Sequence, residues 1–130
     1  MALALLVEDD DDIRDSLEEE LLELGCEVRT AVSGSAALLQ LQLGLRPDFI
    51  LLDLLLPEMS GAELLRTLKL DAVLSTLPVV LMSASRVSAV VSDAGPQHVL
   101  PKPLKRWQLE QIVEWFGGVI EPGRRRADPA

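Results

Sequence analysis

Short apolar runs along this chain alternate with longer segments in which apolar residues recur every three or four positions. A short apolar run bounded by turn residues predicts a strand that is buried on both faces, as in a parallel sheet. The most pronounced run ends at Asp53 and precedes a loop that contains Pro57 and Gly61. In chain order, the expected strands are residues 3–7, 28–32, 49–52 with Asp53 at the carboxyl end, 78–82 and the minimal run 99–100.

The segments between these runs have the spacing of amphipathic helices, with charged residues at the outer positions. Gly25 ends the first helix, and Gly44 and Pro47 end the second, because neither residue type continues a helix well. In chain order, the expected helices are residues 13–24, 36–43, 62–69 and 104–116. Residues 86–95 are rich in Ser and Val, which are mediocre helix formers, so the fourth helix of the pattern is expected to be short or mobile.

Strands that alternate with helices imply βαβ units, and hence a parallel sheet with helices on both faces. Right-handed crossovers and five strands then favour a flavodoxin-like (βα)5 fold, a doubly wound parallel five-stranded sheet with the order 2-1-3-4-5. A chain of 130 residues suits one domain. We expect this domain to span residues 1–118 and a disordered C-terminal tail to span residues 119–130.

Composition and charge narrow the choice of partner and compartment. The net charge of −9 argues against direct DNA binding, which depends on neutralising phosphates with Lys and Arg. The single cysteine, Cys26, cannot form an internal disulfide, so we expect a small core residue and a reducing compartment. No apolar stretch approaches the ~20 residues of a membrane span, and the apolar start of the chain lacks the basic region of a signal peptide. We therefore expect a cytoplasmic protein with no membrane partner.

Two tryptophans lie in the last expected helix, and the sole histidine lies beside a strand end. Trp107 and Trp115 are eight positions apart in the last expected helix, which places them about 80° apart around its axis. At least one of the two rings should therefore be partly exposed, either as a half-buried ring or as a docking residue. His98 is expected to be structural or exposed and not a phosphodonor.

Polar residues from four strand ends meet at one edge of the sheet in this topology. They are Glu8 and Asp9 after the first strand, Asp53 at the end of the third, Ser83 and Ala84 after the fourth, and Lys102 after the fifth. Two carboxylates ~4 Å apart repel each other by roughly 4 kcal/mol at an effective dielectric constant of about 20, so such a cluster requires a cation. Oxygen ligands with no neighbouring His or Cys favour Mg²⁺ or Mn²⁺ over zinc.

A carboxylate held beside a metal ion and a lysine can attack phosphorus and form an aspartyl phosphate. The metal ion and Lys102 would neutralise charge on the phosphoryl oxygens during the transfer. The Ser83 hydroxyl and the Ala84 backbone amide can donate hydrogen bonds to the same phosphoryl group. The strand ends therefore predict phosphoryl chemistry at Asp53.

Four motifs in this order resemble the receiver domain of two-component response regulators. They are Val-Glu-Asp-Asp at 7–10, Leu-Leu-Asp-Leu-Leu-Leu-Pro-Glu-Met-Ser-Gly at 51–61, Ser-Ala at 83–84 and Lys-Pro at 102–103. The resemblance implies that Asp53 is the phosphoacceptor and that Asp9, Asp53 and the Leu55 backbone carbonyl bind Mg²⁺. It also implies that Glu8 reaches the metal through water, that Ser83 is the switch hydroxyl and that Lys102 contacts the phosphoryl group.

The implied function is signalling. A sensor histidine kinase or a phosphotransfer protein would donate the phosphoryl group to Asp53, and an unknown downstream protein would read the result. By this resemblance the chain is not an enzyme that acts on an external metabolite, because it catalyses only its own phosphorylation and dephosphorylation. Homodimer formation stays open.

Two features depart from the family pattern and leave alternatives. Val99 stands three residues before Lys102, where the family has Tyr or Phe, and the stretch from Ser83 to Lys102 is shorter than usual. Both departures favour a pseudo-receiver, an interaction module that does not switch on phosphorylation. A Mg²⁺-dependent phosphoester enzyme of the haloacid dehalogenase type is the second alternative, but it needs Asp-x-Asp after the central strand, and Leu55 occupies the second position.

Overall fold

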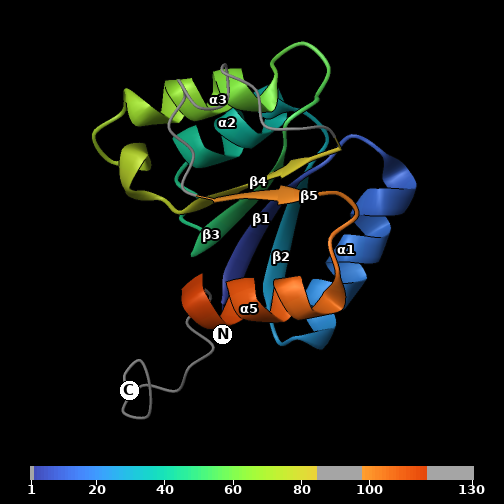
Figure 1. Ribbon diagram of the computed structural model, residues 1–130. Helices are drawn as coiled ribbons and strands as arrows, with labels where there is room; N and C mark the ends of the chain where they lie inside the picture. Colours follow the sequence, from blue (N-terminus) through green and yellow to red (C-terminus); the bar gives the residue numbers. More distant parts are fainter. Residues whose placement is uncertain (1, 85–97, 117–130) are drawn as a thin grey trace, which may run out of the picture.

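The computed structural model describes residues 2–84 and 98–116, and these form a sheet of five parallel strands between two layers of helices (Figure 1). The strand order is β2-β1-β3-β4-β5, which confirms the predicted flavodoxin-like order. The strands are β1 (Leu3–Val7), β2 (Glu27–Ala31), β3 (Phe49–Asp53), β4 (Val79–Ser83) and β5 (His98–Pro101).

Helices cover both faces of the sheet. The helical segments are α1 (Asp11–Glu23), α2 (Gly34–Gln42), α3 (Gly61–Lys69), the 3-10 turn η1 (Leu74–Thr76) and α5 (Arg106–Phe116). In Figure 1, α2 and α3 lie on one face of the sheet, while α1 and α5 lie on the other. The predicted fourth helix at 86–95 and the predicted tail at 119–130 lie outside the described residues. Within the described part of the chain, no helix is both long enough and apolar enough to cross a membrane.

The position of β3 explains its apolar sequence. It pairs with β1 on one side and β4 on the other, and every one of its residues is buried. Ile50 and Leu52 pack in the cluster under α2 and α3, whereas Phe49 and Leu51 pack in the cluster under α1 and α5. A strand that is covered on both faces needs apolar residues at every position, and Asp53 is the first polar residue that this strand can deliver.

Helix caps fix where the helices beside the strand ends begin. The side chain of Asp10 accepts a hydrogen bond from the Ile13 N–H at 3.0 Å and is the N-cap of α1. Ser60 and Glu63 form a reciprocal capping box at the start of α3. These caps fix where α1 begins after Glu8 and where α3 begins after the loop that follows Asp53.

The second strand differs by one residue from the sequence prediction. Residues 28–32 were expected, but β2 is Glu27–Ala31. Its register with β1 pairs Val7 with Ala31, and the Glu8 N–H then donates to the Ala31 carbonyl at 3.0 Å. Val32 lies beyond the last paired residue and is 52% exposed. Apolar character alone did not reveal this end, because register with β1 decides where the strand stops.

Predictions for three side chains can be compared with the structure. Cys26 is buried in the cluster under α1 and α5, as expected for a small core residue. Trp107 is 58% exposed and Trp115 is 53% exposed, which confirms that the two rings cannot both point into the core. The Trp115 ring meets Phe116 in an edge-on arrangement with centroids 6.3 Å apart.

Candidate functional site

The sheet register brings the predicted site residues to one edge. Val7 pairs with Leu52, so Glu8 and Asp53 follow neighbouring positions on β1 and β3. Ser83 pairs with Pro101, and Lys102 therefore follows directly at the end of β5. The loops after β1, β3 and β5 and the last residue of β4 thus converge on the same place, as the strand order predicted.

Lys102 joins two buried carboxylates. Its ammonium nitrogen lies 3.0 Å from Asp53 Oδ2 and 3.1 Å from Glu8 Oε1. Glu8 is 1% exposed and Asp53 is 4% exposed, so both charges are withdrawn from water. Buried carboxylates of this kind require a cation or several hydrogen-bond donors. In this structure Lys102 is the cation that joins them.

The charges of this cluster alter the affinities of its groups for protons. Burial disfavours the ammonium form of Lys102, but its hydrogen bonds to Asp53 and Glu8 outweigh that effect and raise the pKa of Lys102. Burial also raises the pKa of Glu8, although bonds from the Asp10 amide and Lys102 oppose the rise. Lys102 therefore stays positively charged. Glu8 binds a proton more readily than an exposed glutamate does, because it is buried.

Backbone amides hold both carboxylates in place. The Leu55 N–H donates to Asp53 Oδ1 at 3.2 Å, and the Asp10 N–H donates to Glu8 Oε2 at 3.1 Å. Each carboxylate thus accepts one bond from Lys102 and one from the backbone two residues further along the chain. These bonds fix the orientation of the carboxylates before any ligand arrives.

The three acidic residues can hold a metal ion together. One carboxylate oxygen from each of Glu8, Asp9 and Asp53 lies within 4.8 Å of the other two. A ligand set made only of carboxylate oxygens suits a hard cation such as Mg²⁺, which retains several waters. Asp9 is exposed while the other two are buried, so the site opens to solvent on the side of Asp9. The predicted carbonyl ligand, Leu55, belongs to the loop directly after Asp53.

The loop after Asp53 is packed so closely that only glycine fits at position 61. The Gly61 N–H donates to the Leu54 carbonyl at 2.8 Å. A Cβ atom at Gly61 would lie 2.8 Å from the Leu54 Cα and would overlap the Asp53 carbonyl oxygen. The absence of a side chain therefore allows α3 to begin directly beneath the phosphoacceptor candidate.

Ser83 and Ala84 lie at the end of β4, beside the lysine. The Lys102 N–H donates to the Ser83 carbonyl at 2.8 Å, which fixes the start of the lysine loop against β4. Ser83 is 2% exposed, whereas Ala84 is exposed. The structure thus places Ser83 next to Lys102, and Ala84 lines the same groove as the lysine. Their hydrogen bonds to a phosphoryl group remain predictions.

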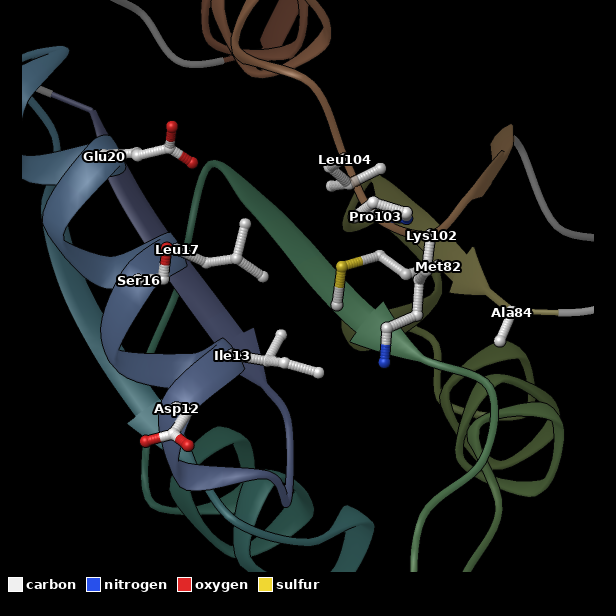
Figure 2. Close-up of a pocket in the computed structure, with 10 residues that line it drawn as sticks. All are labelled: Asp12, Ile13, Ser16, Leu17, Glu20, Met82, Ala84, Lys102, Pro103 and Leu104. Atoms are coloured by element: carbon white, nitrogen blue, oxygen red, sulfur yellow. The ribbon is translucent and has the colours of Figure 1, made fainter.

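An apolar groove of about 530 Å³ runs beside this cluster (Figure 2). Figure 2 shows Ile13 and Leu17 of α1 on one side of the groove, with Met82 and Leu104 on the other. Lys102 lines the same groove, and Asp12 and Glu20 add negative charge along α1. The groove therefore connects an apolar surface of α1 to the lysine that holds Asp53.

Sequence reasoning missed two features of this site. Arg14 donates to the Glu8 carbonyl at 3.1 Å, although its sequence position suggested only an outer face of the first helix. The groove combines residues from α1, β4 and the loop after β5, which no local pattern connects. No local pattern distinguishes Arg14 from the other charged residues of the first helix.

The five-stranded parallel sheet and the acidic edge with its lysine agree with the comparison with known families. The model of the response regulator receiver domain matches residues 4–114. The chain therefore belongs to the response regulator receiver domain family.

Individual relatives are similar over nearly the whole chain. The chain is 37% identical to the transcriptional regulatory protein AfsQ1 of Streptomyces coelicolor over 130 residues, which cover 98% of this chain and 55% of that protein. The chain thus spans about half the length of this relative. A putative response regulator from Chloroflexus aurantiacus has a crystal structure with a TM-score of 0.81 and 33% identity, covering 88% of this chain and 96% of that one.

A third comparison bears on the metal site. The receiver domain of the sensor histidine kinase PA1611 from Pseudomonas aeruginosa matches with a TM-score of 0.81 and 27% identity, covering 88% of this chain and 96% of that one. Its crystal structure has a magnesium ion coordinated in the active-site cleft. Receiver domains bind Mg²⁺ in an acidic pocket, and the cluster of Glu8, Asp9 and Asp53 forms such a pocket here.

Proposed function

We propose that this chain is a switchable receiver that accepts a phosphoryl group on Asp53, with Mg²⁺ held by Glu8, Asp9, Asp53 and the Leu55 carbonyl. The observation that carries the proposal is the Lys102 ammonium bridging Asp53 and Glu8 at the edge where the acidic residues meet. The donor would be the phosphohistidine of a sensor histidine kinase or of a phosphotransfer protein.

Residues of this chain would position the reacting groups. A carboxylate oxygen of Asp53 attacks phosphorus, the bond between phosphorus and the histidine nitrogen breaks, and the imidazole keeps the electron pair. Lys102, which already lies 3.0 Å from Asp53 Oδ2, would follow the negative charge onto the phosphoryl oxygens. The Ser83 hydroxyl and the Ala84 amide would donate to the same oxygens. Bound Mg²⁺ would neutralise the remaining charge.

The groove beside Lys102 is the proposed approach for the protein donor. A donor must bring its phosphohistidine to the edge where Asp53 lies, and the groove places an apolar surface of α1 next to that edge. Its acidic residues Asp12 and Glu20 suit a donor surface that combines apolar and basic side chains.

The groove proposal can be tested at Ile13, which is 37% exposed. Ile13→Lys should lower the rate of phosphorylation by a protein donor relative to the rate with acetyl phosphate, because only the protein donor needs the apolar surface. Leu70→Lys is the control, because Leu70 is exposed but does not line the groove. Measuring both rates for this variant controls for the loss of an exposed aliphatic side chain. An unchanged ratio for Ile13→Lys would exclude this approach.

The proposed output is protein contact. The net charge of −9 supports protein partners over direct DNA binding, and a single buried cysteine supports a reducing, cytoplasmic location.

We retain residues 1–118 as the proposed receiver domain and 119–130 as the proposed tail. The downstream partner and a homodimer remain proposals for the whole protein, since the chain spans 55% of AfsQ1.

Val99 supports the pseudo-receiver as the second candidate. It packs, partly buried, against the cluster under α2 and α3, and pairs with Leu81 in the sheet. A valine there has no ring whose swing could report phosphorylation of Asp53. A pseudo-receiver would keep the fold and the acidic edge without a change in shape.

A beryllofluoride phosphoryl mimic separates the two candidates. Amide spectra of the protein with Mg²⁺ are compared before and after the mimic is added, with Asp53→Asn as the control. A switching receiver gives shifts that extend from the edge at Asp53 to α5. Shifts confined to the loops after β1, β3 and β5 would favour the pseudo-receiver.

A further inference from the structure

We propose that Arg14 is a positioning residue of the metal site, because its guanidinium fixes the turn that carries Glu8 and Asp9. This inference rests on the proposed function, since it concerns the same carboxylates. Through that turn, Arg14 sets the affinity of the site for a divalent cation.

Arg14 connects the end of β1 to the start of α1. Its Nη1 donates to the Glu8 carbonyl at 3.1 Å, and its Nη2 donates to Asp11 Oδ1 at 2.6 Å. The Arg14 side chain is 15% exposed, whereas that of Asp11 is 81% exposed. The guanidinium therefore lies folded over the turn between the two residues, and Asp9 is part of that turn.

Arg14 completes the hydrogen bonding of a buried residue. Glu8 donates its N–H to the Ala31 carbonyl at 3.0 Å, and its two carboxylate oxygens accept from Lys102 and from the Asp10 N–H at 3.1 Å each. The remaining polar atom, the Glu8 carbonyl oxygen, accepts from Arg14. Because a buried carbonyl without a partner is unfavourable, removal of Arg14 favours another conformation of the turn.

The ion pair between Arg14 and Asp11 contributes little by itself. Asp11 is an exposed partner one helical turn away, and ion pairs of this kind contribute little. Its value here is to orient the guanidinium fork so that the other nitrogen faces the Glu8 carbonyl. The role of Arg14 therefore depends on having two donors in a fixed geometry, which lysine lacks.

The direction in which the Mg²⁺ affinity changes when Arg14 is removed distinguishes a positioning role from a simple charge effect. Arg14 is a cation close to a proposed cation site, so a pure charge effect predicts tighter Mg²⁺ binding when it is removed. Positioning predicts the opposite, because groups that orient metal ligands typically change metal affinity by roughly 10- to 100-fold. We expect the Kd for Mg²⁺ to rise at least about tenfold.

The experiment is a calorimetric titration of Mg²⁺ into the wild-type protein and three variants at fixed ionic strength. Arg14→Met keeps the apolar stem and removes both donors, and Arg14→Lys restores the charge and one donor group. Arg29→Met is the matched control, because Arg29 is a half-exposed arginine of β2 that pairs with Glu27. We expect weak binding for Arg14→Met, intermediate binding for Arg14→Lys and wild-type binding for Arg29→Met.

A metal-free measurement accompanies the titration. Without Mg²⁺, the Asp10 amide, which donates to Glu8 Oε2, should exchange its hydrogen faster in Arg14→Met than in the wild type. An unchanged exchange rate would overturn the positioning role.

The titration has outcomes that separate this role from the proposed function. Equal or tighter Mg²⁺ binding by Arg14→Met, beside a wild-type protein that binds, would overturn the role of Arg14 alone. A folded wild-type protein that fails to bind Mg²⁺ would overturn the metal site and this role with it. If Arg14→Met does not fold, a wild-type Kd for Arg14→Lys would overturn the proposal.

Discussion

The ammonium nitrogen of Lys102 lies 3.0 Å from Asp53 Oδ2, and the same nitrogen also holds Glu8 at 3.1 Å. Two carboxylates that would repel each other are thus kept side by side by one lysine from the far end of the sequence. The arrangement gathers negative charge at the sheet edge, and Lys102 balances part of it.

Removing the lysine should destabilise the metal-free protein. Lys102→Met leaves Glu8 and Asp53 buried without their shared cation, and we expect the free energy of unfolding to fall by about 2 kcal/mol. Mg²⁺ should restore part of this loss, because a cation then replaces the lysine between the carboxylates. Urea unfolding with and without Mg²⁺ measures both effects.

Lys105→Met is the control for Lys102→Met, since Lys105 is exposed. Its stability should stay within about 0.5 kcal/mol of the wild type. Equal unfolding midpoints for the wild type and Lys102→Met in the absence of Mg²⁺ would contradict a stabilising role of the bridge.

A methyl group at position 61 should disturb the loop that carries Asp53. In Gly61→Ala the new Cβ would press on the backbone of Asp53 and Leu54, so we expect a loss of at least about 2 kcal/mol in stability and weaker Mg²⁺ binding. Chemical unfolding and a Mg²⁺ titration of the same sample provide the two readings.

Gly44→Ala separates backbone strain from damage to the site. Gly44 has a φ of +113° and open space around its Cα, so alanine there is strained but meets no neighbour. We expect a loss of about 1 kcal/mol and an unchanged Kd for Mg²⁺. If Gly61→Ala bound Mg²⁺ as tightly as Gly44→Ala does, the close packing beneath Asp53 would be irrelevant to the site.

The buried thiol of Cys26 should make the protein less stable in alkali. Burial raises the pKa of Cys26 from its usual 9.0 to about 11. The unfolded chain therefore loses the thiol proton before the folded protein does, so unfolding becomes easier as the pH rises from about 9 to about 11. Below pH 9.0 this contribution is fully present.

Comparing the wild type with Cys26→Ala isolates this effect from other titrations. At about pH 10, the wild type should have lost about 1.4 kcal/mol of stability relative to Cys26→Ala, taking their difference at about pH 7 as the reference. Urea unfolding at the two pH values measures the change. Parallel stability curves for the two proteins would show that the thiol titrates alike in the folded and unfolded states.

The sequence predicted the strand order and the edge cluster because both follow from patterns of apolar and polar residues. The apolar run before Asp53 requires a strand covered on both faces, and parallel strands deliver Glu8, Asp53 and Lys102 to a common edge. The distances of 3.0 and 3.1 Å at Lys102 could not be predicted, since they depend on side-chain conformations.

Features that depend on strand register or on contacts between distant elements could not be predicted from the sequence. Val32 looked like a strand residue, yet the pairing of Val7 with Ala31 ends β2 before it. Arg14 looked like a surface residue, because nothing local indicates that its side chain folds back onto the Glu8 carbonyl. The groove between α1 and the loop after β5 exists only once the chain is folded.

The intact mass of the protein after incubation with acetyl phosphate and Mg²⁺ tests directly whether Asp53 accepts a phosphoryl group. We expect one added phosphoryl group on the wild type, and no added mass on Asp53→Asn or in the presence of EDTA. A folded wild-type protein that binds Mg²⁺ but gains no phosphoryl group, or an adduct that survives in Asp53→Asn, would contradict the assignment of Asp53 as the phosphoacceptor.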